Sequence, residues 1–179
     1  MWYVLQVAEG REDSICENCK KAFVGKEASQ IFVPKYVWLK KVKGVRKKEV
    51  KPLFLGYLFA ESKTPDALQK RLQLLQNVRP VCIGGGFYPI KEEEEVFLRQ
   101  FLGEEKIVRF STGYIVDGEL RVIDGALKNF SKKIRRIDRH NRLAEMEISL
   151  FGQGRIIRVG LEVKAKIARG EFEQMMKEA

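Results

Sequence analysis

Residues 124–140 read DGALKNFSKKIRRIDRH, and this tract carries more information than any other part of the chain. Its apolar positions, Leu127, Phe130, Ile134 and Ile137, predict strands and a turn packed on a small core. The positions between them are almost all lysine or arginine. A small β domain that keeps its core while its surface becomes this basic is expected to bind a polyphosphate.

The composition favours a folded and strongly basic protein. The 179 residues are 45% hydrophobic and carry a formal net charge of +10, which favours nucleic acid or another anionic partner. No apolar run approaches the roughly 20 residues that span a bilayer, and the N-terminal residues lack the basic start of a signal peptide. Three cysteines without an export signal indicate a reducing compartment. We therefore expect a soluble, cytoplasmic protein without a membrane partner, and a monomer.

The first hundred residues alternate between strand and helix patterns. Pro34 places one strand at a sheet edge or on a bulge, and Gly44 is expected at the tip of a hairpin within the basic segment 40–51. Strands are predicted at residues 2–7, 30–41, 53–61 and 78–83, and helices from Asp13, from Pro65 after a Thr64 cap, and over residues 92–102.

The pattern changes near Gly103. From Thr112 onward, short strands are separated by evenly spaced turn signals such as Asp117-Gly118, which is typical of a small barrel. The prediction is therefore an α+β domain followed by an all-β domain. Its boundaries are residues 1–103 for the first domain, 104–111 for a linker, 112–167 for the barrel, and 168–179 for a tail with a helical pattern.

Five motifs resemble the NusG family of transcription factors. They are WYVLQV at 2–7, PLFLGYLF at 52–59 and KEEE at 91–94, which are similar to its N-terminal domain, and the tract 124–138 and SLFG at 149–152, which are similar to its KOW motif and the strand after it. The motifs keep the family's order over about residues 1–165. The resemblance implies an α+β domain with a four-stranded antiparallel sheet, followed by a five-stranded SH3-like KOW barrel.

The resemblance also implies a binding site for RNA polymerase. Members of the family bind the clamp helices of the polymerase through an apolar pocket on the first domain. The positions that would form it here are Phe54 and Tyr57, with Trp2, Leu55 and Phe59 as neighbours. Aromatic side chains commonly anchor interfaces, but they also fill cores. Phe54 and Tyr57 would lie on opposite faces of a strand, so one of them is expected in the core.

Departures from the family pattern indicate a specialised paralogue. Leu55 and Ala126 stand where prolines are usual, Lys132 replaces the KOW glycine, and Gln153 replaces an arginine. These changes weaken the transfer of contacts to termination factor Rho or ribosomal protein S10. The chain is similar to the LoaP group, antiterminators of long biosynthetic operons, which implies recognition of an RNA hairpin by the KOW domain.

The cations of the barrel are the candidate RNA-binding residues. Lysines would contact phosphates, and arginine forks would contact guanine edges or backbone. Because the A-form major groove is narrow, specificity would need a bulge, a loop or a widened groove. The alternative is a solvated basic face. The candidates are Lys128, Lys132, Lys133, Arg135, Arg136, Arg139, His140 and Arg142 around one turn, with Arg155 and Arg158 from a neighbouring hairpin. Arg136 and Ile137 both fall at inward positions, so a bulge or turn is expected near them.

Two further segments are candidates for DNA contact. Asn77 and Arg79 fall where family members contact single-stranded non-template DNA, although Val78 replaces the threonine of the general factor. The segment 40–51 could reach upstream DNA or polymerase; an exposed hairpin without a defined partner is the alternative.

No pattern in the chain predicts an enzyme or a cofactor. Cys16 and Cys19 form a C-x-x-C inside a helix, but no second pair completes a zinc site. His140 lies among cations without a nucleophile beside it. The leading hypothesis is a transcription elongation factor that acts as a processive antiterminator. The alternatives are a general NusG role in which the barrel binds proteins, and a ribosome-associated KOW protein.

Overall fold

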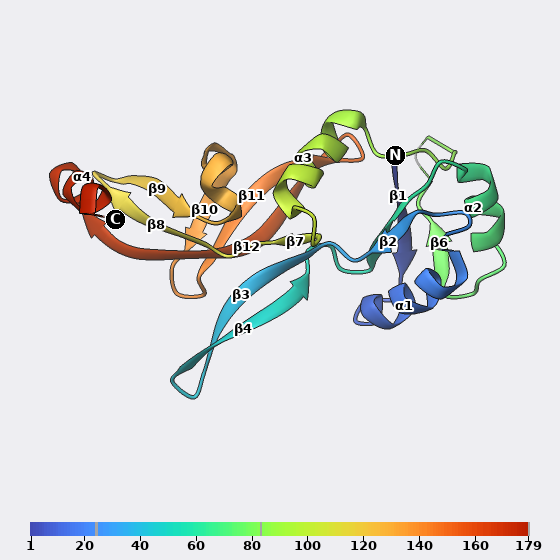
Figure 1. Cartoon of the computed structure of the whole chain (residues 1–179), viewed down its shortest axis with the longest axis horizontal. Coiled ribbons are helices and arrows are strands. Elements are labelled where there is room, and N and C mark those ends of the chain that lie inside the picture. Colours follow the sequence, from blue (N-terminus) through green and yellow to red (C-terminus); the bar gives the residue numbers. More distant parts are fainter. Residues whose placement is uncertain (24, 83, 179) are drawn as a thin grey trace. The chain divides into compact units, whose positions relative to one another are not determined.

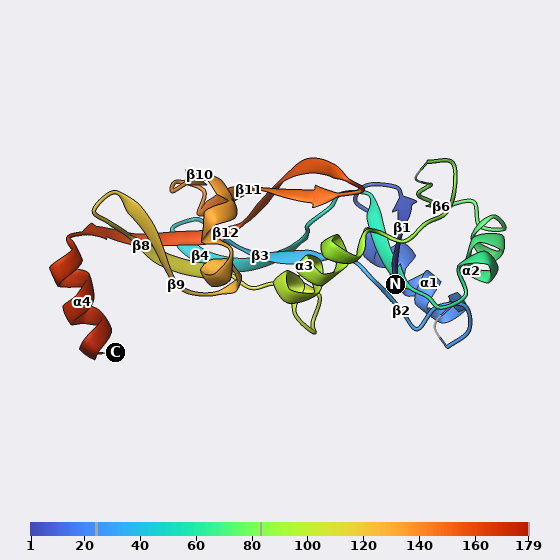
Figure 2. The same cartoon turned by 90° about the horizontal axis from the view of Figure 1, so that it is seen from above.

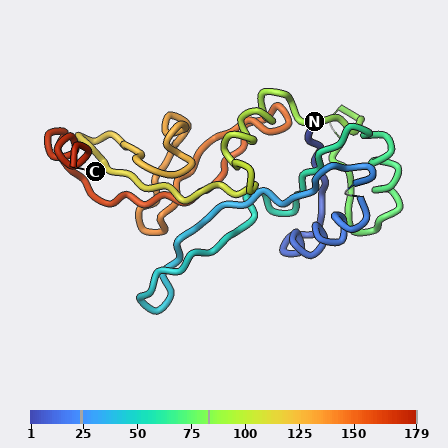
Figure 3. Tube along the Cα trace, viewed as in Figure 1, coloured from blue at the N-terminus to red at the C-terminus, as the bar shows by residue number. Residues whose placement is uncertain are grey.

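The computed structural model describes residues 1–23, 25–82 and 84–178, which form two compact units (Figure 1). The first unit consists of residues 1–35, 52–107 and 149–155, and the second of residues 36–51, 108–148 and 156–178. The backbone therefore passes between the units five times, and its course can be followed by colour in Figure 3. The domain boundaries drawn from the sequence stay a prediction, because the compact units do not follow contiguous segments.

A four-stranded antiparallel sheet forms the centre of the first unit. Its order is β2 (Gln30–Phe32), β5 (Tyr57–Glu61), β1 (Trp2–Val7) and β6 (Val78–Pro80). β1 lies inside the sheet, and five of its six residues are buried, which explains its nearly unbroken apolar sequence. The predicted four-stranded antiparallel sheet is confirmed. The strand predicted at 78–83 is shorter than expected, and Ile83 lies outside the described residues.

Two helices cover one face of this sheet, as Figures 1 and 2 show. They are α1 (Glu12–Phe23) and α2 (Pro65–Leu72). Their apolar residues Ile15, Cys19 and Leu68 join Tyr3 and Leu5 of β1 in one buried cluster. α1 begins with acidic and ends with basic residues, which favours its dipole.

The helix predicted at residues 92–102 is α3 (Glu92–Leu102). Leu98, Phe101 and Leu102 are buried along one side. Glu94 is also buried, with 2% of its surface exposed, because its carboxylate accepts four hydrogen bonds. The donors are the backbone N–H groups of Lys91 (3.2 Å), Phe151 (3.2 Å) and Gly152 (2.8 Å) and the hydroxyl of Ser149 (2.8 Å). Glu94 thus joins the start of α3 to residues 149–155 within the first unit.

Two strand predictions in the first hundred residues are wrong in extent. The strand predicted at 30–41 is interrupted at Pro34, which lacks the N–H needed for strand pairing, and continues as β3 (Lys35–Val42). The strand predicted at 53–61 covers only β5, because the residues before it turn. Gly56 has a φ of +78°, and its N–H donates to the Glu12 carboxylate at 2.8 Å. A strand cannot continue through this conformation.

A long two-stranded hairpin belongs to the second unit apart from its two outermost residues. It consists of β3 and β4 (Val45–Pro52), and β7 (Ile107–Val108) pairs with the other side of β3. Lys43 and Gly44 form its turn with φ values of 48° and 83°. Consecutive positive φ angles are typical of the type I′ turn that suits a hairpin. The predicted tip at Gly44 is therefore correct.

Apart from residues 149–150 and 153–155, a five-stranded sheet also belongs to the second unit, in agreement with the predicted all-β region. Its core includes Leu127, Met146 and Val159, which have no exposed surface. β8 and β12 pair in parallel, whereas β8–β9 and β10–β11 are antiparallel. The order is β10 (Ile134–Asp138), β11 (Leu143–Leu150), β12 (Gln153–Ile167), β8 (Ser111–Val116) and β9 (Glu119–Asp124).

The basic tract at residues 124–140 is less regular than predicted. Two short 3₁₀ helices, η1 (Ala126–Asn129) and η2 (Ser131–Lys133), occupy most of the region between β9 and β10. Gly125 precedes them with a φ of +93°, and a Cβ there would overlap Phe110 O and Ser111 Cα. The pairing register shifts between Ile134 and Arg136, which is the bulge predicted from the sequence.

The described part of the tail forms α4 (Arg169–Glu178), and Ala179 lies outside the described residues. The ring of Phe172 packs edge-on against Tyr114, with 6.0 Å between ring centroids. Among the described residues, no helix combines the length and the apolar character that crossing a bilayer requires.

Candidate nucleic-acid and protein interfaces

The predicted RNA-binding cations of the second unit lie around β10 and the turn that follows it. The turn is fixed by Asn141, whose backbone N–H and side-chain amide donate to the two carboxylate oxygens of Asp138 at 2.9 and 2.8 Å. These hydrogen bonds lower the pKa of Asp138 below its usual value. Arg139 and His140 are exposed at the tip of the turn. We call residues 138–142 the basic turn.

Carboxylates neutralise part of this cationic surface. Arg135 pairs with Glu147 on the neighbouring strand β11. Arg158 pairs with Glu145 at 2.8 Å, and the half-buried Arg142 pairs with Glu162 at 3.3 Å. The cations that make no ion pair within the described residues are Lys128, Lys132, Arg136 and Arg139. These four are therefore the most available to phosphate.

Arg155 lies on β12, the strand that also carries Arg158. It belongs to the first unit, with the rest of residues 149–155, and its guanidinium lies 5.9 Å from the ring centroid of Phe151.

Contacts within the second unit connect the β3–β4 hairpin to the basic turn. The indole Nε1 of Trp38, on β3, donates to the backbone carbonyl of Asn141 at 2.7 Å. Arg46, on β4, pairs with Glu162 at 2.8 Å, and the same carboxylate oxygen accepts from Arg142. Sequence reasoning missed Trp38 and Glu162. No local pattern marks them, because 103 positions separate Trp38 from Asn141.

The residues predicted to bind polymerase lie in or beside an aromatic cluster of the first unit. Ring centroids are 4.9 Å apart for Trp2 and Phe32 and 5.7 Å apart for Phe54 and Phe59. Trp2 and Phe59 have no exposed surface, and Phe54 is nearly buried. These three are core residues, as the alternative interpretation expected.

The remaining two predicted positions offer surface for a partner. Leu55 is 58% exposed, and Tyr57 is half-buried. Phe54 precedes β5, so the period-two argument that placed Phe54 and Tyr57 on opposite faces of one strand does not apply. An apolar contact through Leu55 and Tyr57 would use the aromatic cluster as rigid support.

Charged groups hold the end of β1 beside the cluster. The guanidinium of Arg99 lies 4.5 Å from the ring centroid of Trp2 and pairs with Glu61 and Glu95 at 2.7 Å each. Glu95 also accepts the backbone N–H of Trp2 at 2.9 Å. Burial raises the pKa of Glu61, but the hydrogen bond and charge of Arg99 outweigh it, so the pKa is below its usual value.

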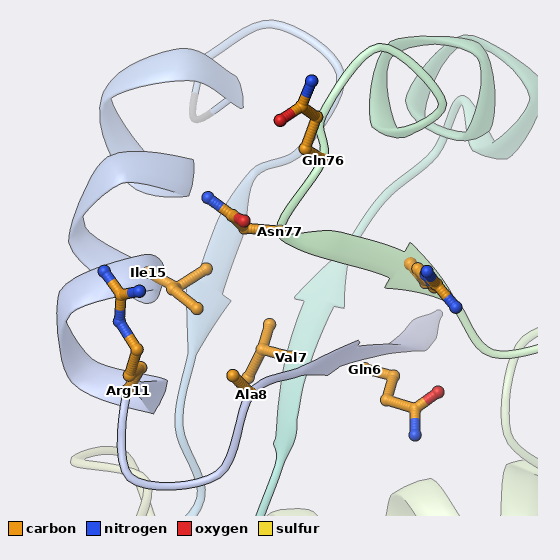
Figure 4. A pocket seen from close by; sticks show the side chains of 8 residues that line it. Gln6, Val7, Ala8, Arg11, Ile15, Gln76 and Asn77 are labelled. Atoms are coloured by element: carbon orange, nitrogen blue, oxygen red, sulfur yellow. The ribbon is translucent and has the colours of Figure 1, made fainter.

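Asn77 and Arg79 line a pocket of about 290 Å³ at one end of the first unit's sheet (Figure 4). β1 and β6 are neighbours there, and Gln6 pairs in register with Arg79. Amide side chains can donate and accept hydrogen bonds, and arginine can contact a phosphate, so this lining suits an unstacked nucleotide. The complete lining is Gln6, Val7, Ala8, Arg11, Ile15, Gln76, Asn77 and Arg79.

The C-x-x-C pair is buried within α1. Burial raises the pKa of the Cys16 thiol and raises that of Cys19 to about 11, so both are neutral at ordinary pH. Across residues 1–23, 25–82 and 84–178, no group of three histidine, cysteine, aspartate or glutamate residues could hold a metal ion.

The chain therefore combines an α/β unit that carries a four-stranded antiparallel sheet with a second, mainly β unit. A family model described as transcription termination factor NusG matches residues 1–99, more than half of the chain. The chain belongs to the NusG family, as its motifs predicted.

Named relatives and a solved structure agree with this assignment. The chain is 23% identical to the transcription termination/antitermination protein NusG of Haemophilus influenzae over 159 residues, covering 85% of this chain and 86% of that protein. It is 23% identical over 161 residues to the protein of that name from Rickettsia typhi, covering 85% and 82%. A structure titled "Domain interaction in Thermotoga maritima NusG" matches with a TM-score of 0.53 and 22% identity, covering 90% of this chain and 93% of that one, which supports the fold.

Proposed function

We propose that this chain is a specialised NusG-type elongation factor, resembling the LoaP group, that acts as a processive antiterminator. The first unit binds RNA polymerase, and the second unit binds a hairpin in the nascent RNA. Tethering the factor to the transcript raises its concentration beside the polymerase. Both partners place it where transcription occurs, in the cytoplasm.

The availability of four cations around η1 and β10 supports the RNA part of the proposal most directly. Lys128, Lys132, Arg136 and Arg139 have no carboxylate partner within the described residues. When such cations bind phosphates, the counterions condensed on the nucleic acid are released, which drives association. Lys132 carries this charge where the family pattern has glycine, so the specialisation falls on the proposed RNA contact.

In-vitro selection tests RNA recognition by the whole chain. A pool of RNA hairpins with randomised loops and bulges is selected for binding at about 150 mM salt. We expect one structural class to be enriched. We also expect Lys132→Gly, which restores the family residue, to weaken its binding by about tenfold, whereas Lys63→Gly at an exposed position of the first unit leaves it unchanged. A pool that stays unselected would refute RNA recognition.

Transcription through terminators then tests the function itself. A selected hairpin is placed upstream of two terminators in series, and full-length transcripts are measured with and without the protein. Processive antitermination raises read-through at both terminators only when the hairpin is present. Read-through that is independent of the hairpin would contradict the mechanism.

A surface on the first unit is proposed for the polymerase clamp helices. Family members interact with RNA polymerase, and Leu55 and Tyr57 are the predicted contact residues that retain exposed area. We expect Leu55→Asp with Tyr57→Ala to weaken polymerase binding at least tenfold in a pull-down titration. Leu74→Asp is the control, because Leu74 is equally apolar and 77% exposed. Equal effects of the two changes would rule out this surface.

A general NusG role, in which the second unit binds proteins such as Rho or ribosomal protein S10, is the second candidate. It is favoured by the neutralisation of Arg135, Arg142 and Arg158 by glutamates, which leaves a mixed surface suited to protein contacts. Under this role the selected RNA pool shows no preference, and Rho or S10 binds the chain directly.

A further inference from the structure

We propose that the β3–β4 hairpin and the basic turn form one continuous surface that holds the stem of a double-helical RNA. This inference rests on the proposed RNA binding by the cations in and before the basic turn, and it extends that binding to a second element, the hairpin, whose role the sequence leaves open. The surface is composed of the hairpin residues 40–51, the basic turn at residues 138–142, and the cations that precede this turn, Lys128, Lys132 and Arg136, all of which belong to the same compact unit.

The charge of the hairpin is the first observation. Residues 40–51 include seven lysines or arginines and one acid, Glu49. We call the β3–β4 hairpin the ribbon. Glu49 lies 3.8 Å from both Lys40 and Lys51, so it neutralises positive charge away from the tip of the ribbon. The exposed lysines that make no ion pair within the described residues are Lys41, Lys43, Lys47 and Lys48.

The connection between the two elements is the second observation. The Trp38 indole donates to the carbonyl of Asn141 in the basic turn at 2.7 Å. Arg46 and Arg142, one from each element, share a carboxylate oxygen of Glu162 at 2.8 and 3.3 Å. Two basic elements repel one another unless something holds them. These contacts therefore fix two cationic groups beside each other, an arrangement that an extended polyanion stabilises.

The dimensions and side-chain chemistry favour a duplex. Eight residues per strand at about 3.3 Å each give a ribbon roughly 26 Å long, comparable with a turn of a nucleic-acid helix. Single-strand binding relies on exposed aromatic rings on which bases stack. The ring of Trp38 does not offer such a platform, because Lys51 lies 4.1 Å from its centroid. Lysines on a rigid ribbon instead suit the phosphate rows of a stem, while the basic turn contacts an adjacent part of the same RNA.

The composite surface predicts that binding depends on stem length. A hairpin RNA with a stem of about 6 base pairs can contact the basic turn alone, whereas a stem of about 16 base pairs can reach the ribbon as well. The probes are these two RNAs with identical loops, and a DNA hairpin with the longer stem. Binding to the full chain is measured by fluorescence anisotropy between about 50 and 200 mM salt.

Charge-matched variants separate the contributions. Lys43→Ser, Lys47→Ser and Lys48→Ser together remove ribbon charge, and Lys132→Ser, Arg136→Ser and Arg139→Ser together remove charge around the basic turn. The control removes three exposed lysines of the first unit, by Lys21→Ser, Lys26→Ser and Lys63→Ser. We expect the ribbon variant to bind the long stem about tenfold more weakly, with a salt slope smaller by up to about 3. Its binding to the short stem should match the control.

A single substitution tests the connection without changing charge. Trp38→Phe keeps an aromatic ring but removes the donor to Asn141, and we expect the long-stem advantage to fall at least threefold. Circular dichroism checks that the variant remains folded. An unchanged long-stem advantage in this folded variant would overturn the proposed coupling.

The outcomes distinguish this inference from the proposed function. If the ribbon variant equals the control on both RNAs while the basic-turn variant is weakened on both, the composite surface is refuted and RNA binding by the turn stands. If neither variant differs from the control, the proposed RNA contacts of the second unit are refuted as well. Equal losses on RNA and DNA stems would overturn the assignment of RNA as the ligand.

Discussion

Glu94 is a buried carboxylate whose role is structural. Its four hydrogen bonds join the KEEE and SLFG motifs, which the sequence shows only as separate family signatures. A charged acceptor is needed because several donors converge on one position, and each would be costly to leave unsatisfied. The acidic start of α3 therefore does more than complement the helix dipole.

Replacement of Glu94 tests this role. We expect Glu94→Ala to lower the free energy of unfolding by about 2–4 kcal/mol, because buried donors lose a charged acceptor. The exposed neighbour provides the control: Glu93→Ala should change it by less than about 0.5 kcal/mol. Urea titration followed by circular dichroism gives both values. Equal unfolding midpoints would show that the carboxylate contributes little.

The cysteines provide a second prediction at this scale. Because burial raises the pKa of Cys19 to about 11 and also raises that of Cys16, neither forms much thiolate at pH 8. Cys82 is exposed. We expect iodoacetamide at pH 8 to label the folded chain once, at Cys82, and to label all three cysteines in denaturant. Peptide mass spectrometry locates the label, and rapid native labelling in α1 would contradict the burial argument.

At the scale of elements, the sequence predicts the bounds of helices and strands best where the spacing of apolar residues alone determines them. The bounds of β1 and α3 agree with their patterns, and the hairpin tip follows from Gly44. Prediction fails where a turn is set by distant groups. Glu12 holds Gly56 and shortens β5, and the packing of Gly125 on Ser111 allows 3₁₀ helices where strands were expected.

Gly125 gives a prediction about the tract that follows it. A Cβ at this position would overlap the backbone of Phe110 and Ser111, and the positive φ adds strain. Gly118 has a similar φ of +87° but open space around it. A substitution at Gly118 therefore measures the cost of the positive φ alone, without the steric overlap. We expect Gly118→Ala to cost about 1 kcal/mol of unfolding free energy and Gly125→Ala clearly more. Similar losses in urea titrations would argue against the close approach.

The candidate site was predictable in composition but not in arrangement. The basic residues could be named from the tract, because charge is visible in the sequence. The sequence does not show which of these cations remain free of an ion pair. Glu145, Glu147 and Glu162 neutralise some of them from neighbouring strands or from distant positions in the chain. The same limit applies to the residues predicted to contact polymerase, because the sequence did not show that Trp2 and Phe59 are fully buried.

At the scale of the whole molecule, each compact unit draws on separated parts of the chain. The chain has two tryptophans, Trp2 in the first unit and Trp38 in the second. With Trp38→Phe in place, fluorescence reports the first unit alone. We expect the fragment 1–103 to unfold at a lower urea concentration than the full chain with this substitution, because residues 149–155 supply three of the donors to Glu94. Identical midpoints would show that the first unit is complete without them.

The dependence of Glu94 on Ser149, Phe151 and Gly152 also sets an order of events during translation. α3 leaves the ribosome first, and its partner residues are made about 50 positions later. At about 5–20 residues per second, the interval is roughly 2–10 s. Throughout that time the Glu94 carboxylate must remain hydrated, so the nascent first unit stays unfinished until residues 149–152 have been synthesised and can fold back onto α3.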